Sequence, residues 1–236
     1  MMSPDYDIVL DVSVIIPSRN RPQLLLDCVH SILDGDRVPA ELIIVDQSDT
    51  PNSTLAALTR VNGSTVRYRW SQTIGTSLAR NEGIDASLHP ITVFTDDDVF
   101  VASDWLGALV TALINSGPKA VVTGLVLPGE PETPGGFAPS TVFDTASIVY
   151  QGRIKKDVLF SGNMALWRST FNEVGRFDPC LGPGTSCFSA EDNDLAFRLL
   201  EAGYRIVYSP AAAVHHRAWR TSVDIWRVKW NYAVGQ

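Results

Sequence analysis

Three consecutive aspartates, Asp96, Asp97 and Asp98, follow the apolar run ITVFT at residues 91–95. The run is typical of a buried strand, along which side chains alternate, so we expect Asp96 and Asp98 to point one way and Asp97 the other. Two carboxylates at this spacing offer oxygen ligands to Mg²⁺ or Mn²⁺, which commonly complete their coordination with substrate phosphates. The alternative is an acidic, solvated turn that caps the next helix. The segment therefore predicts a cation site or a capping turn at a sheet edge.

Composition indicates an ordinary globular chain. Its 236 residues are 45% hydrophobic and 19% charged, which suits one large domain with a substantial core. No apolar run approaches the roughly 18 residues of a membrane span. The segment MMSPDYDIVLD is acidic and lacks the features of a signal peptide, so a cytoplasmic chain is expected.

Charge and cysteine content argue against a nucleic-acid-binding protein and against a protein that holds a metal or a disulfide framework through its cysteines. A net charge of -7 argues against a nucleic-acid-binding protein, whose footprint is basic. Cys28, Cys180 and Cys187 are odd in number and lack metal-type spacing, and we interpret all three as reduced thiols.

Strand and helix patterns alternate through the first half of the chain. Strand patterns occur at residues 12–17, 41–46, 66–70, 91–95 and 120–127. Helical patterns carry apolar residues at 24–33, at Leu55, Leu58 and Val61, at 78–86, and at 103–117 with Ser103 or Asp104 as its cap. This alternation predicts an α/β fold with a mainly parallel sheet flanked by helices, in which ligands bind beyond the carboxyl ends of the strands. Residues 17–21, Asp46 and the three aspartates all lie at such ends.

The alternation breaks at residues 128–139, which contain four prolines and three glycines and predict an irregular, mobile loop near the site. Core-type residues resume in VLFSGNMALW, residues 158–167. A Gly/Pro-rich loop then opens into a helix whose first turn holds Glu191, Asp192 and Asp194 and which Gly203 ends. A strand at 205–210 follows.

Six segments together resemble the family 2 glycosyltransferases, enzymes of the GT-A fold that transfer a sugar from a nucleotide donor with inversion. In chain order they are VSVIIPSRNRP, IIVDQSD, GTSLARN, TDDD, SAEDNDLAFRLLEAGY and SPAAAVHH. The resemblance implies one catalytic domain over residues 1–236, with a nucleotide-binding half at about 10–127, an acceptor-binding half at about 140–216 and a helical tail at about 217–236. Gln47 departs from the family, because many members have a second acid at this place.

The resemblance also implies residues that bind the donor and its metal. Asp46 corresponds to an acid that contacts the base, with an Asx-turn as its alternative role. Asp98 would bind the metal directly and Asp96 would contact ribose or metal, while His216 corresponds to a metal ligand, with His215 as its competitor. An imidazole ligand points toward Mn²⁺ rather than Mg²⁺. The remaining donor-binding candidates are Pro17, Ser18, Arg19, Arg21, Arg80 and Asp97, the arginines because guanidinium groups suit oxyanions.

Asp192 corresponds to the acid that takes the proton from the acceptor hydroxyl, and Glu191 is held in reserve. The alternative is a helix cap, because Ser189 with an acid three residues later resembles a capping box. Gly162 and Asn163 match a segment that lines the donor-sugar or acceptor side, or else they serve packing.

The expected activity is metal-dependent, inverting transfer of a sugar from a UDP- or dTDP-linked donor to a glycan or lipid-linked saccharide. Two alternatives stay open: a sugar-nucleotide pyrophosphorylase, although PSRNRP replaces its glycine-rich phosphate loop, and a domain that binds nucleotide without turnover.

The C-terminal segment HRAWRTSVDIWRVKWNY places Trp219, Val223, Trp226 and Trp230 at helical spacing among basic residues. Such a helix could lie on the inner face of an anionic membrane or hold a lipid-linked acceptor. The alternative is that these tryptophans pack on the core or on a second subunit.

Overall fold

The computed structural model describes residues 9–235, so the N-terminal segment interpreted above as no signal peptide falls largely outside it, at residues 1–8. The strands are β1 (Val9–Ser18), β2 (Val38–Asp46), β3 (Arg60–Val61), β4 (Ser64–Trp70), β5 (Ile91–Thr95), β6 (Val99–Val101), β7 (Ala120–Pro131), β8 (Ile148–Tyr150), β9 (Asn163–Trp167) and β10 (Arg205–Ala218). The helices are α1 (Pro22–Leu33), α2 (Ser53–Ala56), α3 (Thr76–Ala86), α4 (Trp105–Ser116), α5 (Thr170–Val174), α6 (Glu191–Glu201) and α7 (Ser222–Gly235).

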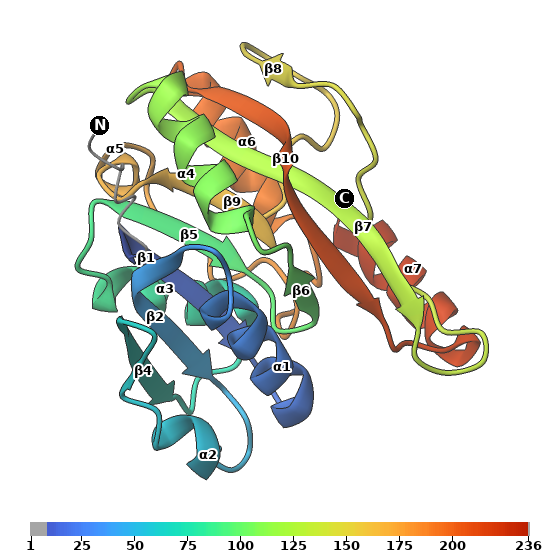
Figure 1. Cartoon of the computed structure of the whole chain (residues 1–236). Coiled ribbons are helices and arrows are strands. Elements are labelled where there is room, and N and C mark those ends of the chain that lie inside the picture. Colours follow the sequence, from blue (N-terminus) through green and yellow to red (C-terminus); the bar gives the residue numbers. More distant parts are fainter. Residues whose placement is uncertain (1–8, 236) are drawn as a thin grey trace.

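All ten strands form one sheet with the order β3-β4-β2-β1-β5-β9-β7-β10-β6, and β8 pairs with β10 (Figure 1). The pairs β4/β2, β2/β1, β1/β5 and β7/β10 are parallel, whereas β9 runs antiparallel between β5 and β7. The predicted α/β fold with a mainly parallel central sheet is confirmed. Because β9 comes from the second half of the chain, the two predicted halves share a single sheet.

Alternation along the strands explains why helices cover both faces. On one face, Val12, Val14 and Ile16 of β1 pack in a cluster with the buried residues of α1 and α4. On the other face, Ile15 packs in a second cluster with α3, α5 and α6. Gly83 makes the close contact of α3 with β1 feasible, since a Cβ at this position would lie 2.4 Å from Ile15.

Three local predictions were wrong, and a fourth, the cap of α4, is confirmed in position only. The helix expected through Leu58 and Val61 ends at Ala56, because Asn62 and Gly63 adopt positive φ values of 50° and 90° and turn β3 into β4. Asp104 holds the N-cap position of α4 without a side-chain cap bond, and Ser103 donates to Asp36 instead. The other two errors concern strands that were expected to be shorter.

Both of these strands lie beside each other at the far end of the sheet. Residues 128–131, predicted to be irregular, continue β7, and residues 211–218 continue β10, with which β7 pairs as far as Pro131 and Ala218. The sequence hides this extension because Pro210 interrupts the apolar pattern, and in the structure Pro210 lies where the register shifts between Ser209 and Ala213. The extension carries His216 toward the carboxyl ends of β1 and β5.

Candidate active site

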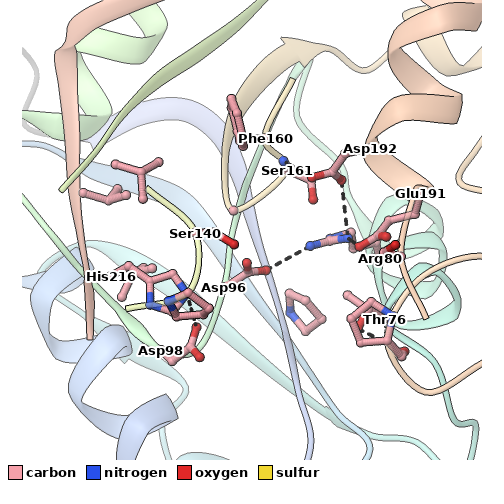
Figure 2. Close-up of a pocket in the computed structure, with 18 of the residues that line it drawn as sticks. Thr76, Arg80, Asp96, Asp98, Ser140, Phe160, Ser161, Glu191, Asp192 and His216 are labelled. Carbon is pink, nitrogen blue, oxygen red and sulfur yellow. Dashed lines mark hydrogen bonds and ion pairs between the residues drawn. The ribbon is translucent and has the colours of Figure 1, made fainter. Parts of the chain in front are cut away.

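A cleft of about 530 Å³ opens beyond the carboxyl ends of β1 and β5 and contains most of the predicted site residues (Figure 2). Those that line it are Pro17, Ser18, Arg19, Arg21, Arg80, Asp96, Asp98, Gly162, Glu191, Asp192 and His216. Asp46, Asp97 and Asn163 are predicted site residues that do not line it. The loop predicted to lie near the site contributes Pro139, and Ser140 and Thr141 follow directly.

The three aspartates form a turn between β5 and β6 rather than the end of a strand, since β5 ends at Thr95. Asp96 and Asp98 both line the cleft and Asp97 is fully buried beneath it, as expected, but the carboxylates of Asp96 and Asp98 bind different partners, Arg80 and His216. Asp97 accepts a hydrogen bond from Ser18 Oγ at 2.6 Å and pairs with Arg21 at 2.9 Å. Burial raises the pKa of Asp97 to about 7, against the opposing charge of Arg21. Asp97 therefore supports the turn from below.

Asp98 sits among cationic and polar donors. Its Oδ2 accepts from Arg21 at 2.8 Å and from Trp219 Nε1 at 3.2 Å, and it lies 3.3 Å from Arg220. Burial disfavours the charge, but His216, Arg21 and Arg220 outweigh burial and hold the pKa of Asp98 below its ordinary value. Asp98 is therefore an ionised carboxylate whose other oxygen, Oδ1, faces His216.

His216 is placed to act as a metal ligand together with Asp98. Its Nδ1 lies 3.2 Å from the carbonyl oxygen of Arg217, which can only accept, so neutral His216 would carry its proton on Nδ1 and offer the lone pair of Nε2 to a cation. That Nε2 lies 3.7 Å from Asp98 Oδ1 (Figure 2). Two ligands that are each about 2.0–2.2 Å from one ion lie roughly 3–4 Å apart, so this separation fits a shared divalent cation.

His215, the competing candidate, is exposed on β10 and does not line the cleft. Within residues 9–235, no group of three or more His, Cys, Asp or Glu side chains is arranged to hold an ion. The protein therefore offers Asp98 and His216, and the remaining ligands of a cation would come from substrate phosphates and water.

Arg80 was predicted to contact the donor, but its guanidinium is engaged by acids. The side chain is 3% exposed, and its Nη2 donates to Asp96 Oδ1 at 2.9 Å. Its Nη1 donates to Glu191 Oε1 at 3.3 Å and lies 3.9 Å from Asp192 Oδ1. Gly162 packs directly on Asp96, because a Cβ there would lie 2.6 Å from Asp96 Oδ2. Asp96 is thus turned toward Arg80 and away from Asp98.

Asp192 lies at the start of α6 but does not form the capping box that the sequence allowed. The N-cap residue is Ala190, in a left-handed conformation with φ of 77°, so Ser189 is one position too early. Asp192 Oδ2 instead accepts from the backbone N–H of Ser161 at 3.0 Å. Asp192 Oδ1 is buried and has no hydrogen-bond partner within the part of the chain described. Burial raises the pKa of Asp192 against the opposing charge of Arg80.

Glu191, the reserve candidate, is held under the loop that precedes α6. A Cβ at Gly182 would lie 2.9 Å from its Cδ, and Arg80 binds its Oε1. Burial, followed by the neighbouring charge of Asp192, raises the pKa of Glu191 to about 7, while Arg80 opposes this shift. Asp192 is therefore the more accessible of the two carboxylates, since its side chain is 27% exposed and that of Glu191 is 11% exposed.

Two predicted residues have structural partners instead of cleft positions. Asp46 Oδ1 accepts from the backbone N–H of Ser48 at 2.9 Å, which is the Asx-turn alternative, and its Oδ2 accepts from Tyr68 at 2.7 Å. Its neighbour Gln47 lines the cleft. Asn163 bonds to Trp105 Nε1 and to the carbonyl oxygens of Leu125 and Ala212, so it serves packing.

Sequence reasoning missed three contributors to the site: Ser161, Trp219 and Arg220. Ser161 acts through its backbone N–H, which leaves no mark on residue type. Trp219 and Arg220 belong to the segment that was assigned to a tail helix, although α7 begins only at Ser222. The sequence signal that could have placed Arg220 at the site is its position four residues after His216.

Comparison with known proteins identifies the family of the chain. The model of the family "Glycosyl transferase family 2" matches residues 13–175. The "Pre-mycofactocin glycosyltransferase" of Mycobacterium tuberculosis is 28% identical over 92% of this chain and 44% of its own length. The "O-antigen chain rhamnosyltransferase WbaN" of Salmonella anatum is 26% identical over 79% of this chain and 59% of its own length.

Among solved structures, GalNAc-T7 with UDP, GalNAc and Mn²⁺ superposes with a TM-score of 0.66 at 19% identity, over 92% of this chain and 47% of that one. Fold and site thus define a GT-A-like domain of the glycosyltransferase class. The chain belongs to glycosyl transferase family 2. It spans about half the length of the relatives it matches.

Proposed function

We propose that this chain transfers a sugar from a nucleoside-diphosphate donor to a hydroxyl acceptor, with a divalent cation and with inversion at the anomeric carbon. The observation that carries the proposal is the arrangement across the cleft, in which Asp98 and His216 lie on one side and the carboxylate of Asp192 on the other (Figure 2). Family membership supports the activity, and GalNAc-T7, which shares the fold, was solved with UDP and Mn²⁺.

The donor side would stabilise the departing diphosphate. Arg19, Arg21 and Arg220 all line this cleft and bring positive charge to it. Asp98 and His216 would hold a divalent cation, which when bound neutralises charge on the phosphates. Mn²⁺ is the better match because one of the two ligands is an imidazole.

The acceptor side would supply the base. Ser161 fixes Asp192 through Oδ2, and the Asp192 carboxylate, whose side chain is 27% exposed in the cleft, would take the proton from the acceptor hydroxyl. The acceptor oxygen then forms a bond to C1 of the sugar as the bond from C1 to the diphosphate oxygen breaks, and the electron pair leaves with the nucleoside diphosphate. Attack from the side opposite the leaving group inverts C1.

We propose a UDP- or dTDP-linked donor and a glycan or lipid-linked saccharide acceptor. The name of the Salmonella relative, which refers to an O-antigen chain, supports an acceptor of this class. A non-catalytic nucleotide-binding domain remains the second candidate, because the engaged state of Asp46 removes one expected contact to the base.

A donor panel tests the proposal. UDP-, dTDP- and GDP-sugars are first ranked by thermal shift with and without Mn²⁺, since a ligand present at about 100 times its Kd stabilises a protein by about 2.7 kcal/mol. Release of free nucleoside diphosphate is then measured with saccharide acceptors. Metal-dependent release supports transfer, whereas binding without release identifies the non-catalytic alternative. Failure of every donor to bind contradicts both.

We further propose that α7 contacts an anionic membrane that carries the acceptor. No helix within residues 9–235 is long and apolar enough to cross a membrane. On α7, Trp226 and Trp230 are 79% and 67% exposed and thus do not pack on the core, and the exposed residues Arg227 and Lys229 add positive charge. Trp219 differs, because it packs against Arg21 and Arg220 beside Asp98.

Co-sedimentation with vesicles of phosphatidylglycerol and phosphatidylcholine tests this surface. The unmodified chain should pellet with vesicles rich in phosphatidylglycerol, and Trp226→Ala/Trp230→Ala should stay in the supernatant. Leu88→Ala, which removes an exposed apolar residue outside α7, is the control. If the unmodified chain ignores both kinds of vesicle, the membrane proposal fails.

A further inference from the structure

Arg80 occupies an unusual position between the two sides of the cleft. Three acids surround its guanidinium: Asp96 from the turn after β5, and Glu191 and Asp192 from α6. Figure 2 shows Arg80 between Asp96 on one side and Asp192 with Glu191 on the other. These acids come from parts of the chain that are separated by about a hundred residues, so their relative placement depends on contacts of this kind.

The fold holds Arg80 rigidly in this place. Arg80 lies on α3, which Gly83 brings close to β1, and its guanidinium stacks over the ring of Phe177 at 5.3 Å. Its Nε is buried, so a ligand in the cleft does not reach this atom. Both Nη atoms point at carboxylates. Arg21 also pairs with two aspartates but its side chain is 31% exposed, whereas that of Arg80 is 3% exposed, so Arg80 has little surface left for a diphosphate.

We propose that Arg80 is a positioning residue that fixes Asp96, Glu191 and Asp192 in one arrangement, and that it does not bind the donor. This inference rests on the proposed transfer activity, and it names a role that differs from the donor contact expected from the sequence. Arg80 binds Asp96 through Nη2 and Glu191 through Nη1, with Asp192 Oδ1 next to Nη1, so a planar group with two arms is required. A lysine would supply the charge but only a single ammonium group.

The charge of Arg80 also acts on the base. The groups that face Asp192 are Arg80, Glu191, Asp96 and the backbone N–H of Ser161. Of these, Arg80 is the cation, and it opposes the burial that raises the pKa of Asp192. Loss of this charge should leave Asp192 protonated to a higher pH.

The test compares Arg80→Lys and Arg80→Gln in turnover, donor KM, UDP affinity by calorimetry, and the pH dependence of kcat. Both variants should lower kcat by about 10²-fold, as expected when reacting groups lose their alignment, with UDP affinity nearly unchanged. In Arg80→Gln the acid limb of the pH profile should also move to higher pH. Arg80→Lys carries the test if Arg80→Gln does not fold.

Arg198→Lys is the matched control, since Arg198 also binds an acid of α6, Asp194, but does not line the cleft. It should leave kcat, UDP affinity and pH profile unchanged. A loss confined to UDP affinity, or a folded Arg80→Lys with unmodified kcat, would overturn the inference. Lack of activity in the unmodified chain would instead refute the proposed function.

Discussion

Replacing Asp192 with asparagine separates a catalytic base from a structural acid. Asparagine retains an oxygen that can accept the Ser161 N–H, so the contact that anchors the side chain at 3.0 Å should survive. The proton acceptor is lost, however, because an amide does not take a proton at neutral pH. A missing general base should lower kcat by roughly 10²–10⁴-fold, or about 3–5 kcal/mol in the barrier.

The stability of Asp192→Asn should not fall, whereas the loss of a helix cap would lower it. Burial raises the pKa of Asp192, which means that its charge is disfavoured in the folded state, so a neutral amide should not lower the melting temperature. Loss of a helix cap would instead cost about 0.5–2 kcal/mol of stability and little turnover.

Turnover, UDP affinity and melting temperature are measured side by side for Asp192→Asn and for Asp194→Asn. Asp194 lies in the same first turn of α6 but pairs with Arg198, so it controls for general effects of charge near the helix terminus. We expect only Asp192→Asn to lose turnover, with UDP affinity intact. Near-native turnover combined with a lower melting temperature would refute the reasoning and direct attention to Glu191.

Two other predictions concern the metal and pH. Asp98→Ala should abolish the metal dependence of UDP binding in calorimetry. The control Asp104→Ala, which removes an exposed acid without a cap bond, should keep this dependence. Equal UDP affinity with and without Mn²⁺ in the unmodified chain would contradict the prediction. The pKa of Glu191 is raised by burial and by Asp192 to about 7 from an ordinary 4.5, so its contribution to stability is present below pH 4.5 and lost as pH rises to 7. The unfolding free energy of the unmodified chain should therefore fall between pH 4.5 and 7, and in Glu191→Gln this fall should be smaller by on the order of 1–3 kcal/mol. Urea denaturation across this pH range measures the difference. Identical pH dependence in the two proteins would contradict the assigned burial.

The sequence predicted those parts of the fold that depend on local pattern. The strands at Val12–Pro17, Glu41–Asp46 and Ile91–Thr95 and the helix with its inner face at Leu195 and Leu199 carry apolar periodicity that directly reflects burial. Elements that depend on long-range pairing were missed. The short strands β3, β6 and β8 owe their existence to partners far along the chain or to a tight turn, and no periodicity marks them.

The site shows the same division. Motifs placed Asp98, Asp192 and His216 around one cleft. Asp98 follows β5 and Asp192 lies in the first turn of α6, both of which the pattern identified, whereas His216 lies in the part of β10 that the pattern missed. What a motif could not reveal is how side chains pair. Arg80 was expected at the donor and is instead enclosed by acids, and Asp46 is held by Ser48 and Tyr68. Such pairing depends on side-chain distances that only the folded chain defines.

The most direct test of the proposed site is a crystal structure of the chain grown with UDP and Mn²⁺, with diffraction data collected for anomalous scattering from manganese. The account predicts an anomalous peak that contacts both Asp98 Oδ1 and His216 Nε2, next to the diphosphate, with the nucleotide in the cleft lined by Pro17 and Arg19. It further predicts that Arg80 keeps its contacts with Asp96 and Glu191 in the complex. A nucleotide bound elsewhere, or a manganese peak without Asp98 as a ligand, would contradict it.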